Sequence, residues 1–144
     1  MTEADQVEVA IRLESRQDGE RTVTEYRGRL FRKTKAVYLR YVETDEDEAS
    51  SSVTVRYDGE ELRILRQGKV DGEQSFVSGK RRQGSYTTPI GRLRLETETE
   101  LLRMTGEPGG KLPLTLDWSY GLWIEEEWTG RFELRLHIKE VEPS

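Results

Sequence analysis

Residues 111–120 read Lys-Leu-Pro-Leu-Thr-Leu-Asp-Trp-Ser-Tyr. Every second residue from Leu112 to Tyr120 is apolar or aromatic, and the residues between them are polar or proline. A helix returns to the same face after about 3.6 residues and cannot place this set on one side, whereas a strand alternates its side chains between two faces. The stretch therefore predicts a β-strand with one buried face and one wet face.

The same alternation continues through most of the chain. Residues 7–13 and 132–138 place Val, Ile, Leu or Phe at every second position. Between such runs, Asp18-Gly19 and Asp58-Gly59 provide the Asp-Gly pairs favoured in tight hairpins, because glycine accepts a positive φ. About ten such runs, with turns between them and no convincing helical pattern, predict an all-β protein.

The number of predicted strands also indicates how the sheet ends. An open sheet of that size would expose unpaired edges, and a closed barrel removes them. The 144 residues contain no visible internal repeat or interdomain linker and fit a single domain. We therefore predict one domain over residues 1–144, a single antiparallel up-and-down β-barrel with about eight to ten strands.

Composition excludes several classes of function. The net charge of -5 argues against a general nucleic-acid binder, whose phosphate contacts need a cationic surface. The chain has no cysteine, so disulfides, thiolate metal sites and cysteine nucleophiles are excluded. The first apolar residues are interrupted by Glu8 and Arg12, which favours neither a signal peptide nor a membrane span. We expect a cytoplasmic protein with no nucleic-acid or membrane partner.

No residue set predicts catalysis. The single histidine, His137, alternates with apolar neighbours and so shares the polar face of its strand with Glu133 and Arg135. Acidic residues such as Glu125-Glu126-Glu127 are too abundant for any one pair to be specific. We therefore predict no catalytic residue, no metal site and no cofactor, and rank an enzymatic function below binding.

The most specific landmark is the stretch from Gly79 to Gly91. Its glycines and proline predict that the backbone leaves one strand, turns sharply and enters another. Its core has the pattern Gly-x-Tyr-x-Thr-Pro-x-Gly, formed by Gly84, Tyr86, Thr88, Pro89 and Gly91. With the long hairpin strands around it, this stretch resembles the YwiB-like family over nearly the whole chain. Those are small bacterial proteins of unknown function with a calycin-type barrel.

The resemblance implies a calycin or lipocalin-like barrel, an architecture that in related superfamilies holds a small apolar or amphipathic ligand. The matching prediction here is that Arg81, Arg82 and Tyr86 line one end of the barrel, where a guanidinium group grips a carboxylate or phosphate. Adjacent arginines point to opposite faces of a strand, so at most one faces inward. The other predicted ligand-binding residues are Thr88, Tyr26 and Tyr38. Alternatively, Pro89 and Gly91 only build a turn, and Tyr86 only packs across a neighbouring strand.

A second hypothesis needs no ligand. A barrel of about eight strands can be filled by its own side chains, and such a protein would act through its outer surface, by forming a homodimer or contacting another partner. Trp118 shares its face with Leu116 and is predicted to be in the core. Trp123 or Trp128 is a candidate for a barrel mouth or an intersubunit contact.

Overall fold

The computed structural model describes residues 6–44, 46, 48–106 and 111–141, and these residues form ten β-strands and no helix. In chain order the strands are β1 (Gln6–Gln17), β2 (Glu20–Lys33), β3 (Ala36–Thr44), β4 (Ser50–Tyr57), β5 (Glu61–Gly68), β6 (Asp71–Val77), β7 (Arg81–Thr88), β8 (Gly91–Thr105), β9 (Leu114–Ile124) and β10 (Glu127–Glu140). The described residues accordingly contain no helix that could span a bilayer.

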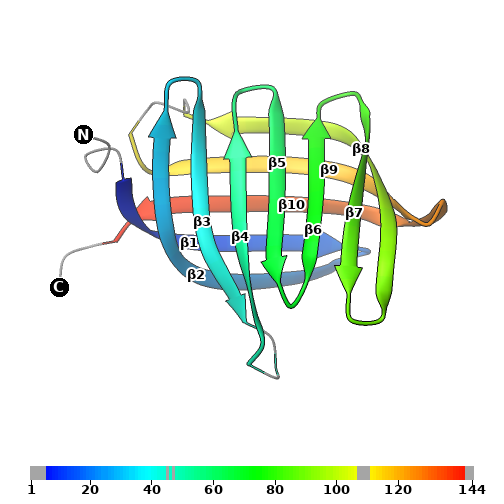
Figure 1. Ribbon diagram of the computed structural model, residues 1–144. Helices are drawn as coiled ribbons and strands as arrows, with labels where there is room; N and C mark the ends of the chain where they lie inside the picture. Colours follow the sequence, from blue (N-terminus) through cyan, green and yellow to red (C-terminus); the bar gives the residue numbers. More distant parts are fainter. Residues whose placement is uncertain (1–5, 45, 47, 107–110, 142–144) are drawn as a thin grey trace.

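The ten strands form one closed ring. Each strand pairs antiparallel with its neighbours in sequence, and β10 returns to pair with β1, where Ile11 lies opposite Ile138. In Figure 1, β3 to β7 stand in front of β1, β8, β9 and β10 and run across them, so the barrel is flattened into two layers. The predicted all-β, up-and-down antiparallel barrel is confirmed.

Apolar side chains from the inward faces fill the space between the two layers. Phe76 on β6 is 1% exposed, and its ring centroid lies 4.7 Å from that of Tyr120 and 6.2 Å from that of Trp118. Trp118 is 3% exposed, so its predicted place in the core is confirmed. The inward alternation also buries two hydroxyl residues, Thr97 and Thr99, on β8. Thr97 donates a hydrogen bond to the backbone oxygen of Ser75 on the opposite layer.

The landmark at residues 79–91 is more ordered than its glycines suggest. It contains the whole strand β7 between two turns, in which Gly79 and Gly91 have φ angles of 77° and 145°. Gly84, in the middle of that strand, approaches β6 so closely that a Cβ atom there would lie 2.3 Å from the backbone oxygen of Glu73. The predicted sharp turn is therefore two turns that flank a strand. The sequence does not show the full strand because the close approach of β6 requires glycine at position 84, where alternation would place an apolar side chain.

Strand direction fixes which turns lie together. Because successive strands alternate in direction, the turns that follow β1, β3, β5, β7 and β9 all lie at one end of the barrel, which we call the hairpin end (Figure 1). The turn after β1 is the predicted Asp18-Gly19 hairpin, with φ angles of 51° and 84°. The predicted Asp58-Gly59 hairpin lies at the opposite end, between β4 and β5.

Candidate ligand-binding site at the hairpin end

A row of inward-facing residues crosses five strands near the hairpin end. Tyr41 lies opposite Val53, Val53 opposite Arg66, Arg66 opposite Gly72, and Gly72 opposite Tyr86. Residues opposite one another in a ladder share a face, and Val53 is fully buried, so the row lines the interior. A Cβ atom on Gly72 would lie 3.2 Å from Cδ1 of Tyr86. The Tyr86 ring therefore lies over the glycine, beside Arg66.

Arg66 is held by one carboxylate. Its Nε donates to Oε1 of Glu43 at 3.0 Å, and its Nη2 donates to Oε2 at 3.5 Å. The two side chains are only 21% and 29% exposed. Burial acts to lower the pKa of Arg66, but the hydrogen bond and charge of Glu43 outweigh it and raise that pKa. The guanidinium group is thus a fixed positive charge inside the barrel end.

Tyrosines surround this ion pair. The ring centroids of Tyr26 and Tyr41 are 4.6 Å apart. Burial raises the pKa of Tyr120 to about 12, and the charge of Arg66 acts in the opposite direction on that phenol. Burial also raises the pKa of Tyr41, again with Arg66 opposing it. The charge of Arg66 therefore affects the pKa values of phenols on different strands. We call this set of residues the tyrosine–arginine cluster: Tyr26, Tyr41, Glu43, Arg66, Tyr86 and Tyr120.

An apolar wall accompanies the cluster. Leu13 on β1 and Phe132 and Leu134 on β10 face inward, pack against the core and are only partly buried. Phe132 also stacks on Tyr120, with ring centroids 5.5 Å apart. The hairpin end thus combines partly exposed apolar side chains, phenols and one guanidinium group, which suits a molecule with an apolar part and an anionic group.

The structure brings two of the six predicted ligand-binding residues, Tyr26 and Tyr86, into this cluster. Arg81 instead lies on the outer face, where its guanidinium group is 4.0 Å from the Trp123 ring centroid and bonds Glu96 at 2.8 Å. Arg82 is exposed and pairs with Thr97 in the ladder. The two arginines point away from each other, as expected for neighbours on a strand, and neither lies beside Arg66.

Thr88 helps to form the turn after β7. Its Oγ1 accepts a hydrogen bond from the backbone N–H of Ile90 at 3.3 Å and lies 3.4 Å from the backbone oxygen of Gly91, to which it donates. These local bonds account for its place in the landmark. Its ligand-binding role stays a prediction.

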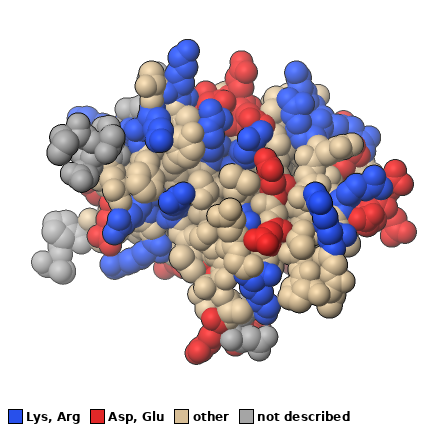
Figure 2. All heavy atoms as spheres, in the orientation of Figure 1, with Lys and Arg blue, Asp and Glu red and all other residues tan. Residues whose placement is uncertain are grey.

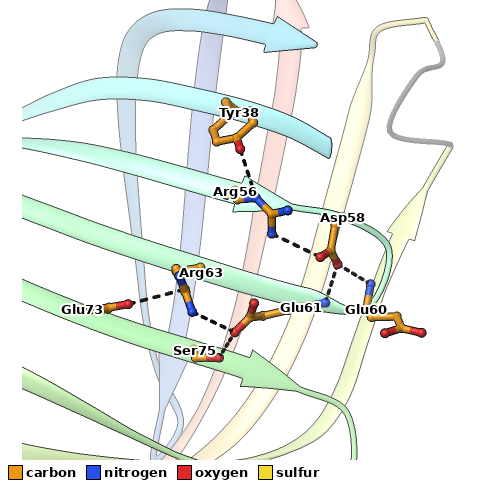
Figure 3. Close-up of polar contacts among 8 residues, drawn as sticks. All are labelled: Tyr38, Arg56, Asp58, Glu60, Glu61, Arg63, Glu73 and Ser75. Atoms are coloured by element: carbon orange, nitrogen blue, oxygen red, sulfur yellow. Dashed lines mark hydrogen bonds and ion pairs between the residues drawn. The ribbon is translucent and has the colours of Figure 1, made fainter. Parts of the chain in front are cut away.

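Tyr38 lies on the outer face in a polar network (Figure 3). Its hydroxyl accepts a hydrogen bond from Nε of Arg56 at 3.1 Å, and Arg56 also binds Asp58. Asp58 accepts hydrogen bonds from the backbone N–H groups of Glu61 and Glu60, which lower the pKa of its carboxyl group. Tyr38 is therefore separated by the sheet from Tyr26 and Tyr86.

Sequence reasoning missed Glu43, Arg66, Tyr41 and Tyr120 as site residues. A signal for the first two was present, since alternation from Leu62 and Ile64 continues to Arg66. In the same way, alternation from Val37 and Leu39 reaches Glu43 after Tyr41. A charged residue at a position where alternation expects a buried apolar one indicates a paired or functional group, because burying an unpaired charge is costly.

The single histidine lies on the outer face of the barrel. His137 interacts through Nδ1 with Oγ1 of Thr115 at 2.9 Å, on the outer faces of β10 and β9. Within residues 6–44, 46, 48–106 and 111–141, no three His, Asp or Glu side chains are arranged to hold a metal ion.

Comparison with known proteins supplies the family. Residues 6–136 match the family described as "Domain of unknown function (DUF1934)". The chain belongs to the DUF1934 family. Among similar proteins of known sequence, the uncharacterized beta-barrel protein YwiB of Bacillus subtilis (strain 168) is 30% identical over 107 residues, which cover 72% of this chain and 75% of YwiB.

The solved structures agree on the fold of this DUF1934 protein. The crystal structure of the ywiB protein from Bacillus subtilis matches it with a TM-score of 0.78 and 20% sequence identity, covering 96% of this chain and 94% of that one. The resemblance to the YwiB-like family is confirmed, and with it the barrel. The sequence match and the structural match are thus to the same protein.

Proposed function

We propose that this DUF1934 barrel binds a small amphipathic anion at the hairpin end. Its carboxylate or phosphate group binds Arg66, and its apolar part lies against Leu13, Phe132 and Leu134. The observation that carries the proposal is the guanidinium group of Arg66, held inside a barrel end lined by tyrosines. The cytoplasm is the proposed compartment, because a chain without cysteine needs no oxidising environment.

The chemistry of Arg66 supports this assignment. A guanidinium group has five N–H donors, and Glu43 accepts only from Nε and Nη2. The remaining donors and the hydroxyls of Tyr26 and Tyr86 are suited to a second anion. Charge-assisted hydrogen bonds of this kind gain strength where water is partly excluded. The partial exposure of Arg66 and Glu43 leaves a route for the ligand to reach them.

Titration with decanoate tests the proposal, with 1-decanol as the uncharged probe. We expect decanoate to bind with heat detectable by calorimetry and decanol to bind about tenfold or more weakly, since it offers Arg66 no charge. The double substitution Glu43→Gln with Arg66→Gln keeps a hydrogen-bonded pair and should reduce decanoate binding to the level of decanol. Arg92→Gln removes an exposed arginine of the neighbouring hairpin and should leave binding unchanged.

Decanoate binding that survives the double substitution but is lost in Arg82→Gln would move the anion site to the residue that sequence predicted. Equal binding of decanoate and decanol would contradict an anion site altogether. Either result is distinguishable from misfolding by the unchanged near-ultraviolet circular dichroism that we expect for all three variants.

One observation favours the alternative of a barrel that acts by self-association. Trp128 is 54% exposed, and its ring lies over Gly121, where a Cβ atom would be 2.6 Å from the indole. Trp123 meets it edge-on, with ring centroids 4.9 Å apart. Exposed tryptophan is enriched at protein interfaces.

If this surface joins two copies of the chain, sedimentation velocity will show a dimer that dissociates in Trp128→Ser. The dimer should persist in Val42→Ser, because Val42 is another exposed apolar residue. A monomer at all protein concentrations would exclude this alternative.

A further inference from the structure

The outer face of β2 to β5 carries a groove that is separate from the hairpin-end cluster. It has a volume of about 490 Å³. Lys33 and Arg40 line it together with Phe31, Tyr38 and Leu65. These residues alternate along their strands with buried ones such as Leu30, Leu39 and Ile64, so the sheet lies between the groove and the interior.

Positive charge is concentrated beside this groove. Arg29 on β2 lies directly opposite Arg40 on β3, an arrangement in which like charges repel across the ladder. Arg29 also faces Glu8 on β1, but in the described part of the structure neither arginine nor Lys33 forms an ion pair. Figure 2 shows Lys and Arg side chains gathered over β2 and β3 on this face.

Neighbouring arginines on the same face are neutralised. Arg56 binds Asp58 at 3.1 Å, and Arg63 lies 3.6 Å from Glu61 and 3.4 Å from Glu73 (Figure 3). The chain has more acidic than basic residues, so carboxylates were available for every cation. Among the described residues, the cationic side chains at the groove thus have no carboxylate partner, whereas Arg56 and Arg63 on the adjoining strands do. Arg29 and Arg40 remain opposite each other despite their repulsion.

The rest of the groove is apolar. Phe31 lies opposite Tyr38 in the ladder, and Leu65 is 38% exposed. Nζ of Lys33 lies 5.5 Å from the Tyr38 ring centroid, so a cation and an aromatic surface meet at one side. Thr54, between Arg40 and Leu65, adds a hydroxyl to the lining.

We propose that this groove is a second binding site, specific for a phosphate monoester carrying a planar apolar group. The phosphate binds Arg40 and Lys33, with Arg29 adding to the local positive charge, and the planar group lies against Phe31, Tyr38 and Leu65. A cluster of three cations suits the doubly charged phosphate better than a singly charged carboxylate. The two halves of the groove together select the ester over inorganic phosphate.

Calorimetric titration with phenyl phosphate, inorganic phosphate and benzoate tests the site. We expect phenyl phosphate to bind about tenfold more tightly than either of the others, since only it uses both halves of the groove. Arg40→Gln should weaken phenyl phosphate binding about tenfold or more. Leu65→Ser should weaken phenyl phosphate and leave inorganic phosphate unchanged. Arg16→Gln, at an exposed position on β1, is the matched control and should change neither.

Arg40→Gln should also raise the midpoint of thermal unfolding slightly, because the repulsion with Arg29 is removed. Loss of binding in a protein that is more stable cannot be explained by a damaged fold. Phenyl phosphate binding that is unaffected by Arg40→Gln, or inorganic phosphate that binds equally well, would overturn the groove as a specific site. Binding lost in the Glu43→Gln and Arg66→Gln double variant, but kept in Arg40→Gln, would assign the ester to the hairpin end instead.

Discussion

Replacing Phe76 by alanine should lower the free energy of unfolding by about 3–5 kcal/mol, the range for truncating a fully buried phenylalanine. Phe76 is 1% exposed and contacts the rings of Tyr120 and Trp118 on the opposite layer. Beyond Glu73, strand β6 leaves the ladder with β7, and Ser78 after it bridges to Thr99 on β8. The phenyl ring therefore packs between the layers at this crossing point, and its loss leaves a cavity there.

Urea unfolding followed by tryptophan fluorescence measures this effect, and Trp118 should report it directly through a red-shifted native emission. Val42→Ala is the control, because Val42 is 54% exposed and should change stability by less than about 0.5 kcal/mol. A cost below about 1 kcal/mol for Phe76→Ala would mean that the interior is loosely filled, contrary to the packing described here.

Breaking the ion pair between Glu43 and Arg66 should also be costly, and more so for one partner than for both. Arg66→Met leaves Glu43 without its cation, and Glu43→Gln leaves Arg66 without its anion. We expect about 1–3 kcal/mol for each, below the 3–5 kcal/mol of a fully buried pair, because the side chains are 21% and 29% exposed. The double variant should cost clearly less than the sum of the two.

The coupling energy from this cycle can be compared with that of an exposed pair. Arg81 and Glu96 meet at 2.8 Å with side chains 48% and 35% exposed, and exposed pairs couple by about 0–1 kcal/mol. If both cycles gave the same coupling, the barrel end would be as well solvated as the outer face. Arg66 would then lose the environment on which the proposed anion site depends.

Alternation predicted the strands well wherever one face was consistently apolar and the other consistently polar. Residues 7–13 and 132–138 lie within β1 and β10, and the predicted strand at residues 111–120 begins only at Leu114 in β9. The apolar sets of these three strands face the interior. The full extent of β7 was not predicted, because Gly84 interrupts the alternation at the place where β6 comes close. The requirement for space depends on contact with β6, which the alternation within β7 does not report.

The candidate sites were harder to predict for the same reason. Tyr26, Tyr38 and Tyr86 were all predicted to bind a ligand. Tyr26 and Tyr86 face the interior, whereas Tyr38 lies on the outer face of its strand. Arg66 joins Glu43 from a strand two places away, and no pattern within one strand reports that contact. The pairing of Arg29 with Arg40 likewise depends on ladder register, which the sequence of either strand does not contain.

The ring closes through its two outermost strands, with Val9 opposite Glu140. During synthesis, therefore, β1 has no lateral partner on one side until β10 has left the ribosome. Contacts between such distant segments slow folding, since the entropy of closing a long loop must be met before the contact forms. The nascent sheet carries two exposed borders throughout that interval, and charged residues along β1, such as Glu8 and Arg12, disfavour pairing of its open border with another chain.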